Sequence, residues 1–248
     1  MNILNNEKAN KYFILFLAIM IFLLTVLLYR EKKQNNNLKE QINGINFFIK
    51  NNDIIKKQYE EIIKYYNKSN WENVIKKRNE YLEFFQKYNF IEFINPNLYL
   101  YSSNAYYKLW KKSKDINFLE NAKRDIDLYN DNNNGRALFI KGLIYLEIYY
   151  IEKDIRKKID GLENSVKYFS KAYKILKKDE TDVSEKEINN ALYHLILAKL
   201  RLAEAYLNTK DIYSTEKICK ELTEFINSKE LKNGNVNYLF QIFKNICK

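Results

Sequence analysis

The stretch LAEAYLNTKDIY, Leu202–Tyr213, decides the fold class. A small residue, Ala203, stands one helical turn before Tyr206, and apolar positions flank the pair at helical spacing. A small residue lets the two helices of a hairpin approach closely, and an aromatic ring one turn later fills the space between neighbouring hairpins. The same pair occurs twice more, as Ser103 with Tyr106 and as Gly142 with Tyr145.

These pairs resemble the first helix of a tetratricopeptide repeat. The second helix of that family carries a small residue, an aromatic residue four positions later, and another small residue three positions after that. Ser165, Phe169 and Ala172 match this pattern well. Looser matches are Ala122, Ile126 and Tyr129, then Thr215, Cys219 and Leu222, and an early unit with Ile62 and Tyr65 followed by Trp71, Val74 and Arg78.

The resemblance covers about two-thirds of the chain and predicts an all-α fold, an irregular TPR-like helical-hairpin array or α-solenoid. The tyrosines Tyr106, Tyr145 and Tyr206 are 39 and 61 residues apart, whereas the family repeats every 34 residues, and no repeat ends with the family's proline. Extra residues are therefore expected around 147–162 and 178–187, as longer helices or loops. An unrelated helical bundle is the alternative.

The composition agrees with an all-helical chain. The 248 residues include 5 glycines and 1 proline, and hydrophobic residues make up 46%. Collagen-like, proline-rich and disordered classes are thereby excluded, and a turn-rich β protein is disfavoured. Breaks between helices are expected at 95–97, 130–135, 178–184 and 233–235, and Val236–Ile246 is expected to form an amphipathic helix that caps the stack.

The N-terminal run YFILFLAIMIFLLTVLLY, Tyr12–Tyr29, contains 18 residues without a charge, glycine or proline. At 1.5 Å per residue it reaches the length needed to cross a hydrocarbon core of about 30 Å. Bulky and charged residues follow it, where a cleavable signal peptide would have small ones, so an uncleaved signal anchor is predicted. A cleaved signal peptide and a buried core helix are the alternatives.

The sequence leaves open which side of the membrane the C-terminal part occupies. Lys8 and Lys11 precede the run, and Arg30, Lys32 and Lys33 follow it, which slightly favours a cytoplasmic C-terminal part. Long domains translocate largely regardless of their charge, however, and bacterial proteins with such anchors are commonly exported. The predicted localisation is a single-pass membrane protein, with a slight preference for an extracytoplasmic domain.

After the run, Leu38, Ile42, Ile45 and Ile49 line one helical face in steps of four and three residues. This spacing fits a dimerising coiled coil of about two heptads, but the preferred interpretation is a first helix that packs on its own domain. Asn35–Asn37 suggests a loose joint, and Asn51–Asp53 suggests the cap of a new helix. The predicted parts are a polar tail (1–11), a transmembrane helix (12–29), a helical linker (30–54) and a repeat domain (55–248).

The net charge of +11 raises the possibility of nucleic acid or anionic lipid as a partner. The lysines are spread along the chain and interleaved with acidic residues, so nucleic-acid binding is not the preferred interpretation. Two cysteines exclude a dense disulfide scaffold, and their separation fits either redox compartment. Cys219 is interpreted as a small buried side chain and Cys247 as part of a frayed end.

No catalytic motif is recognisable. The glycines are isolated, so there is no phosphate-binding loop. His194 lies in an apolar helical stretch and is interpreted as structural, and the carboxylates of Glu60, Glu61, Asp125 and Asp127 are interpreted as solvated. No catalytic, cofactor-binding or metal-binding residue is predicted, no cofactor is expected, and the chain is not expected to be an enzyme.

The resemblance to tetratricopeptide repeats implies a groove that binds a protein or peptide, lined mainly by the first helix of each hairpin. The residues expected to face this groove are Asn104, Lys108, Arg136, Glu147, Glu204 and Asn208. Their amides and charges suit a peptide backbone and its carboxylates. The sequence thus predicts a membrane-anchored interaction scaffold that binds an unknown protein. The alternatives are a self-associating structural protein with a short coiled coil, or a basic surface for anionic lipid or nucleic acid.

Overall fold

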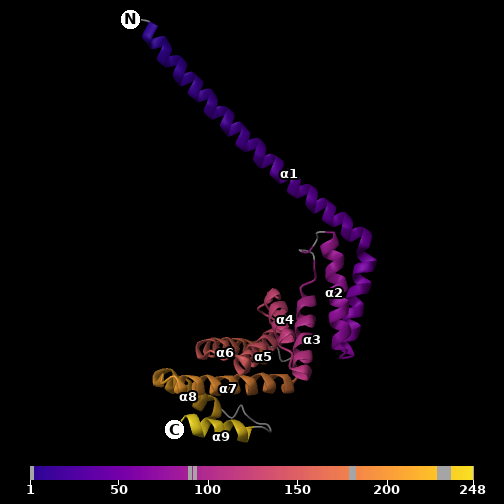
Figure 1. Cartoon of the computed structure of the whole chain (residues 1–248), viewed down its shortest axis with the longest axis vertical. Helices are drawn as coiled ribbons and strands as arrows, with labels where there is room; N and C mark the ends of the chain where they lie inside the picture. The colour runs from indigo at the N-terminus through magenta and orange to yellow at the C-terminus, as the bar shows by residue number, and fades with distance from the viewer. Residues whose placement is uncertain (1–2, 89–90, 92–93, 179–182, 228–235, 248) are drawn as a thin grey trace. The chain divides into compact units, whose positions relative to one another are not determined.

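The computed structural model is all-helical in the residues that it describes, with no strand among them (Figure 1). It describes the backbone of residues 3–88, 91, 94–178, 183–227 and 236–247. Side chains are described for the same ranges apart from 3–28, 37, 40, 41, 45, 48, 226, 227, 236 and 237. The predicted all-α fold class is confirmed.

The helices begin and end close to the predicted breaks. They are α1 (Ile3–Asn67), α2 (Trp71–Lys87), α3 (Asn97–Ser113), α4 (Ile116–Leu128), α5 (Gly135–Ile151), α6 (Ile155–Lys178), α7 (Glu185–Asn208), α8 (Ile212–Asn227) and α9 (Val236–Ile246). The extra residues expected around 147–162 and 178–187 mainly lengthen the helices. Helices α6 and α7 have 24 residues each, whereas α4 has 13.

The chain divides into two compact units, Met1–Lys57 and Gln58–Lys248. In the first unit, α1 runs without interruption through Asn35–Asn37 and Asn51–Asp53, so the predicted joint and cap are wrong. Asn51 fits inside the helix because its Nδ2 donates a hydrogen bond to the Phe47 carbonyl, 2.9 Å away.

The predicted membrane span Tyr12–Tyr29 lies, except for Tyr29, outside the residues whose side chains are described. Within the described part of the chain, no helix is both long and apolar enough to cross a bilayer.

A shared turn closes three of the hairpins in the second unit. A residue with positive φ is followed directly by Asn or Asp, whose side chain accepts a hydrogen bond from a backbone N–H in the first turn of the next helix. These pairs are Ser69 with Asn70, Lys114 with Asp115, and Lys210 with Asp211. The same local conformation therefore precedes α2, α4 and α8.

The small residues singled out in the sequence lie opposite one another inside the hairpins. The Ser103 hydroxyl of α3 donates to the Ala122 carbonyl of α4 at 2.8 Å. The Ser165 hydroxyl of α6 donates to the Gly142 carbonyl of α5 at 3.0 Å. In the third case the Thr215 hydroxyl lies 3.5 Å from the Ala203 carbonyl. Small side chains at these points bring the paired backbones together, as predicted.

From α2 to α8 successive helices pack on one another, and α9 packs on α7. The α5–α6, α6–α7 and α3–α4 contacts are the most extensive, and α3 also touches α5, α5 touches α7 and α7 touches α9 (Figure 1). Leu239 of α9 is buried, with Ile242, Phe243 and Ile246 packed against the same core. Helix α9 therefore covers apolar surface on α7.

The two cysteines form a disulfide bond between α8 and the residue after α9. The Cα atoms of Cys219 and Cys247 are 5.5 Å apart. The interpretation of Cys219 as a simple buried side chain and of Cys247 as frayed is therefore wrong. Nothing in the local sequence around either cysteine indicates the pairing, because the two are 28 residues apart.

Loss of this disulfide is expected to destabilise the second unit. A bond that closes a loop of this length restricts the unfolded chain, so Cys247→Ser is expected to lower the free energy of unfolding by about 2–4 kcal/mol. Urea denaturation of the full chain in mild detergent, followed by circular dichroism, measures the loss. A reducing agent should destabilise the wild type and leave Cys247→Ser unchanged, and equal stability of the oxidised and reduced wild type would contradict the prediction.

Candidate functional site

The residues predicted to line a peptide groove lie along the first helices of successive hairpins. Asn104 of α3 is half-buried, and its amide donates to the Tyr66 hydroxyl near the end of α1. Burial raises the pKa of Tyr66 above its ordinary value, so the phenol stays protonated. Asn104 thus joins the first hairpin to the second.

Glu147 of α5 is the centre of a polar cluster with α3. Its carboxylate lies 2.9 Å from the Lys111 ammonium, 3.4 Å from the Trp110 indole nitrogen and 3.5 Å from the Tyr107 hydroxyl. Burial, followed by the nearby carboxylate, raises the pKa of Tyr107 well above its ordinary value. Glu147 therefore fixes α5 against α3 through charge-assisted contacts.

Arg136 and Glu204 are also engaged within the chain. The Arg136 guanidinium lies 2.8 Å from the Glu187 carboxylate at the start of α7 and holds its pKa below the ordinary value. Glu204 accepts a hydrogen bond from Arg201, which also donates to the Tyr238 hydroxyl of α9 at 3.1 Å. Both residues thus take part in contacts that involve α7.

Lys108, Arg136 and Asn208 are the exposed members of the predicted set, and the Arg136 guanidinium nevertheless pairs with Glu187. The structure therefore does not gather the six residues at one point. Asn104, Arg136 and Glu147 form cross-links between successive first helices, and Glu204 braces Arg201, whose guanidinium reaches α9.

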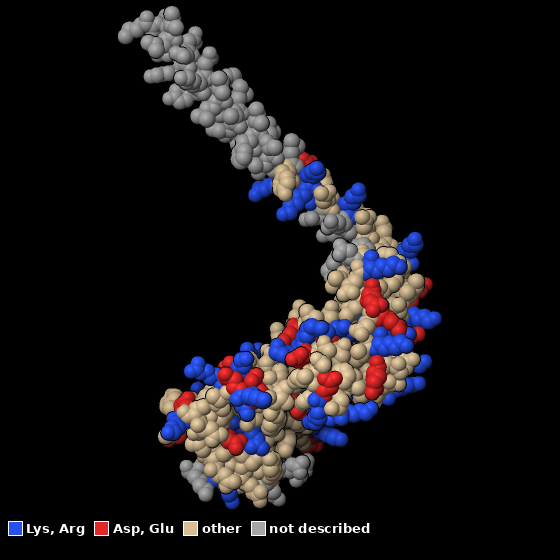
Figure 2. Space-filling view, viewed as in Figure 1, with Lys and Arg blue, Asp and Glu red and all other residues tan. Residues whose placement is uncertain are grey.

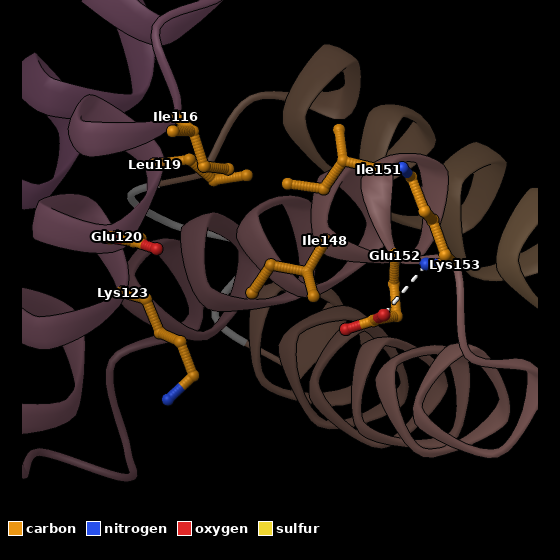
Figure 3. A pocket seen from close by; sticks show the side chains of 8 residues that line it. All are labelled: Ile116, Leu119, Glu120, Lys123, Ile148, Ile151, Glu152 and Lys153. Carbon is orange, nitrogen blue, oxygen red and sulfur yellow. Dashed lines mark hydrogen bonds between the residues drawn. The ribbon is translucent and has the colours of Figure 1, made fainter.

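A pocket of about 480 Å³ lies between the first half of α4 and the end of α5 (Figure 3). In Figure 3 the aliphatic side chains of the two helices point toward the same space, and charged side chains stand at its edges. Ile116 and Ile151 at its mouth are 42% and 38% exposed. The pocket is lined by Ile116, Leu119, Glu120, Lys123, Ile148, Ile151, Glu152 and Lys153.

The size and lining of this pocket are those of a binding site for apolar groups, which usually occupies about 300–1,000 Å³. At its edge, the Glu152 carboxylate accepts a hydrogen bond from the Lys153 backbone N–H at 2.8 Å. Lys123 is held by Asp127 at 2.9 Å. Sequence reasoning missed the pocket because its walls come from two hairpins, although the exposed isoleucines at the ends of both helices were a usable signal.

A buried ion pair links α2, α3 and α4. The Asp125 carboxylate is fully buried and accepts hydrogen bonds from Arg78 Nη2 and from the Ser102 hydroxyl, each at 2.6 Å. The interpretation of Asp125 as a solvated surface carboxylate is therefore wrong. The sequence did contain an indication that Arg78 is buried, because it lies on the same face of α2 as the apolar side chains of Val74, Tyr81 and Phe85.

His194 has a structural environment, as the sequence indicated. Its Nδ1 lies 2.9 Å from the Asn190 carbonyl, and its ring centroid is 5.3 Å from that of Phe139 and 5.6 Å from that of Phe169. Burial is the main cause that lowers the pKa of this imidazole below 6.5. The folded chain therefore favours neutral His194.

The stability of the second unit is expected to fall as the pH decreases through the ordinary histidine range. Below pH 6.5 the unfolded chain takes up a proton at His194 that the folded chain resists, so acid favours unfolding. We expect the loss of stability from about pH 7.5 to about pH 5.5 to be smaller in His194→Phe than in the wild type. Urea titrations at several pH values measure it, and parallel curves for the two proteins would refute the assignment.

Charges of both signs mix on the face of the second unit that Figure 2 shows. Figure 2 shows Lys and Arg interspersed with Asp and Glu on the visible face of the second unit. Among the described residues, no group of three or more His, Cys, Asp and Glu side chains is arranged to hold a metal ion. A scan against models of protein families finds no match for this chain, and a search of curated proteins finds no relative.

Proposed function

We propose that the protein is a membrane-anchored scaffold whose TPR-like helical array binds another protein and performs no catalysis. The pocket between α4 and α5 is the observation that carries the proposal. It opens beside exposed Ile116 and Ile151, and burial of such aliphatic surface by a partner is favourable by about 25 cal/mol per Å².

The chemistry of the pocket defines the kind of partner. Its apolar floor suits a protein segment that presents aliphatic side chains, and its edges carry acidic Glu120 and basic Lys153. Mixed charges at the edge favour a protein segment with charges of both signs over a polyanion. The interspersed charges seen in Figure 2 support the same preference over nucleic acid.

The repeated construction of the hairpins supports the TPR-like α-solenoid. The turns at Ser69, Lys114 and Lys210 share one conformation, and the same contact between small residues recurs in three hairpins. Successive first helices α3, α5 and α7 touch one another, as they do in stacked hairpin arrays. Stacked hairpins present extended surfaces to protein partners.

The apolar run Tyr12–Tyr29 supports the membrane anchor, and the disulfide supports a domain on the extracytoplasmic side. Disulfides persist in oxidising compartments and are rare in the cytosol. Cys219 and Cys247 would be expected to stay reduced on the cytoplasmic side. Protease accessibility in intact and opened cells, combined with thiol alkylation, tests both the side and the bond.

Site-specific photocrosslinking in native membranes tests the function. A photoreactive side chain at Ile116 reports on the pocket, and one at Ile212, which is 61% exposed on α8, is the matched control. We expect discrete protein adducts from position 116 that are absent from position 212 and are lost when Ile151→Asp is added. Identical adducts from both positions, or none from position 116, would overturn the proposal.

A further inference from the structure

Helix α1 exposes large aliphatic side chains along one face of the first unit. Leu38, Ile42 and Ile49 are 55%, 56% and 73% exposed. Among its described residues the first unit consists of α1 alone, so no other element of that unit covers these side chains, and the expectation that the stripe packs on its own domain stays a prediction. Ile45, the fourth residue of the stripe by sequence, lies outside the residues whose side chains are described.

We propose that Leu38, Ile42, Ile45 and Ile49, here called the α1 seam, pair with the same seam of a second copy in a parallel two-stranded coiled coil. Steps of four, three and four residues place Leu38 and Ile45 at d positions and Ile42 and Ile49 at a positions. Leu38 at d with Ile42 at a is the combination that favours a parallel dimer, whereas Ile45 at the second d position, with isoleucine at a, favours higher oligomers. The choice of two strands therefore rests on Asn35, because a single asparagine at an a position specifies the oligomeric state.

The residues around the α1 seam also fit a second copy of the same chain. Asn35 and Asn52 occupy the next a and d positions on either side, and polar residues at such positions fix register. In this register the e positions Lys39 and Asp53 face the uncharged g positions Gln34 and Phe48 of the other copy. Within residues 34–53, no pair of like charges at e and g therefore opposes the association.

Parallel orientation rests on the proposed membrane anchor, because two copies inserted by the same N-terminal run start their α1 helices at the same level. Two heptads alone form a weak coiled coil, and confinement to a membrane raises the effective concentration of the second copy. The α1 seam would then present two helical-repeat domains side by side to their partners.

Oxidative cross-linking of single cysteines in the full chain, in membranes, tests the α1 seam. Ile42→Cys and Ile49→Cys lie on the seam, and their neighbours Asn43→Cys and Lys50→Cys are exposed controls one position away. We expect several-fold more disulfide-linked dimer from the two seam positions than from the two controls. The wild-type chain, with its cysteines already joined, gives the background.

A second pair of variants separates the α1 seam from other uses of the helix. Ile42→Asp is expected to abolish dimers captured by a chemical cross-linker, whereas Ile54→Asp, at an exposed isoleucine off the seam, should preserve them. Equal cross-linking at all four cysteine positions, or its absence while the chain remains in the membrane pellet, overturns the proposal. Loss of membrane association with Ile42→Asp, without an effect on dimers, also overturns it.

Failure of the anchor is distinguishable from failure of the α1 seam. A chain that is released from membranes by alkaline extraction, yet gives the periodic cross-linking pattern, refutes the anchor and supports the seam. A chain that stays in the membrane without the periodic pattern refutes the seam alone.

Discussion

Replacing Asp125 with alanine is expected to lower the free energy of unfolding by about 3–5 kcal/mol. The carboxylate is fully buried and bonded to Arg78 Nη2 and to Ser102 at 2.6 Å. Its removal leaves the guanidinium of Arg78, which is only 7% exposed, without its buried counter-charge. Urea denaturation of the full chain in mild detergent, followed by far-ultraviolet circular dichroism, measures the loss.

Asp127→Asn is the matched control for Asp125→Ala. Asp127 is on the same helix, and its carboxylate lies 2.9 Å from Lys123 and 2.8 Å from Lys141 near the surface. Surface ion pairs contribute about 0–1 kcal/mol each, so its substitution should cost far less. In a double-mutant cycle, Arg78→Met with Asp125→Ala should lose less than the sum of the single changes. Similar losses for Asp125→Ala and Asp127→Asn would show that burial of the ion pair does not govern stability.

Asp125 also illustrates what the sequence does not reveal. Local pattern placed the later helices close to where they lie, because caps, breaks and apolar period are encoded within a few residues, but it wrongly predicted breaks inside α1 at Asn35–Asn37 and Asn51–Asp53. Whether a carboxylate is solvated depends on a partner elsewhere, and here Arg78 is 47 residues away. The disulfide between Cys219 and Cys247 escaped prediction for the same reason.

The six candidate binding residues do not form one site, because contacts with residues of neighbouring helices determine where each side chain lies. A helical pattern indicates that Glu147 points away from its own hairpin. It does not show that Trp110 and Lys111 of the preceding hairpin meet its carboxylate. In contrast, the contact between Gly142 and Ser165 was predictable, because small residues at helical spacing mark the crossing point of two adjacent helices.

Phe169→Ala is expected to destabilise the chain by about 3–5 kcal/mol, because the ring is fully buried and its loss leaves a cavity. The ring packs at the crossing of α5 and α6, where a Cβ added at Gly142 would lie 2.7 Å from two of its carbon atoms. Gly142→Ala therefore overpacks the wild-type core, at a cost of about 1–3 kcal/mol. Urea denaturation of the full chain measures each variant.

Whether Gly142→Ala is destabilising or stabilising tests directly if the Phe169 ring is the reason that position 142 requires glycine. In the Phe169→Ala background the obstructing ring is gone, and alanine is favoured over glycine in a helix by about 1 kcal/mol, so Gly142→Ala should become stabilising. Gly161→Ala is the control, since its Cβ would meet its nearest neighbour, the Tyr145 carbonyl oxygen, at an ordinary 3.6 Å, and it should be tolerated in both backgrounds. If Gly142→Ala were equally destabilising with and without the ring, Phe169 would not be what requires glycine there, and close approach of α5 and α6 would need another cause.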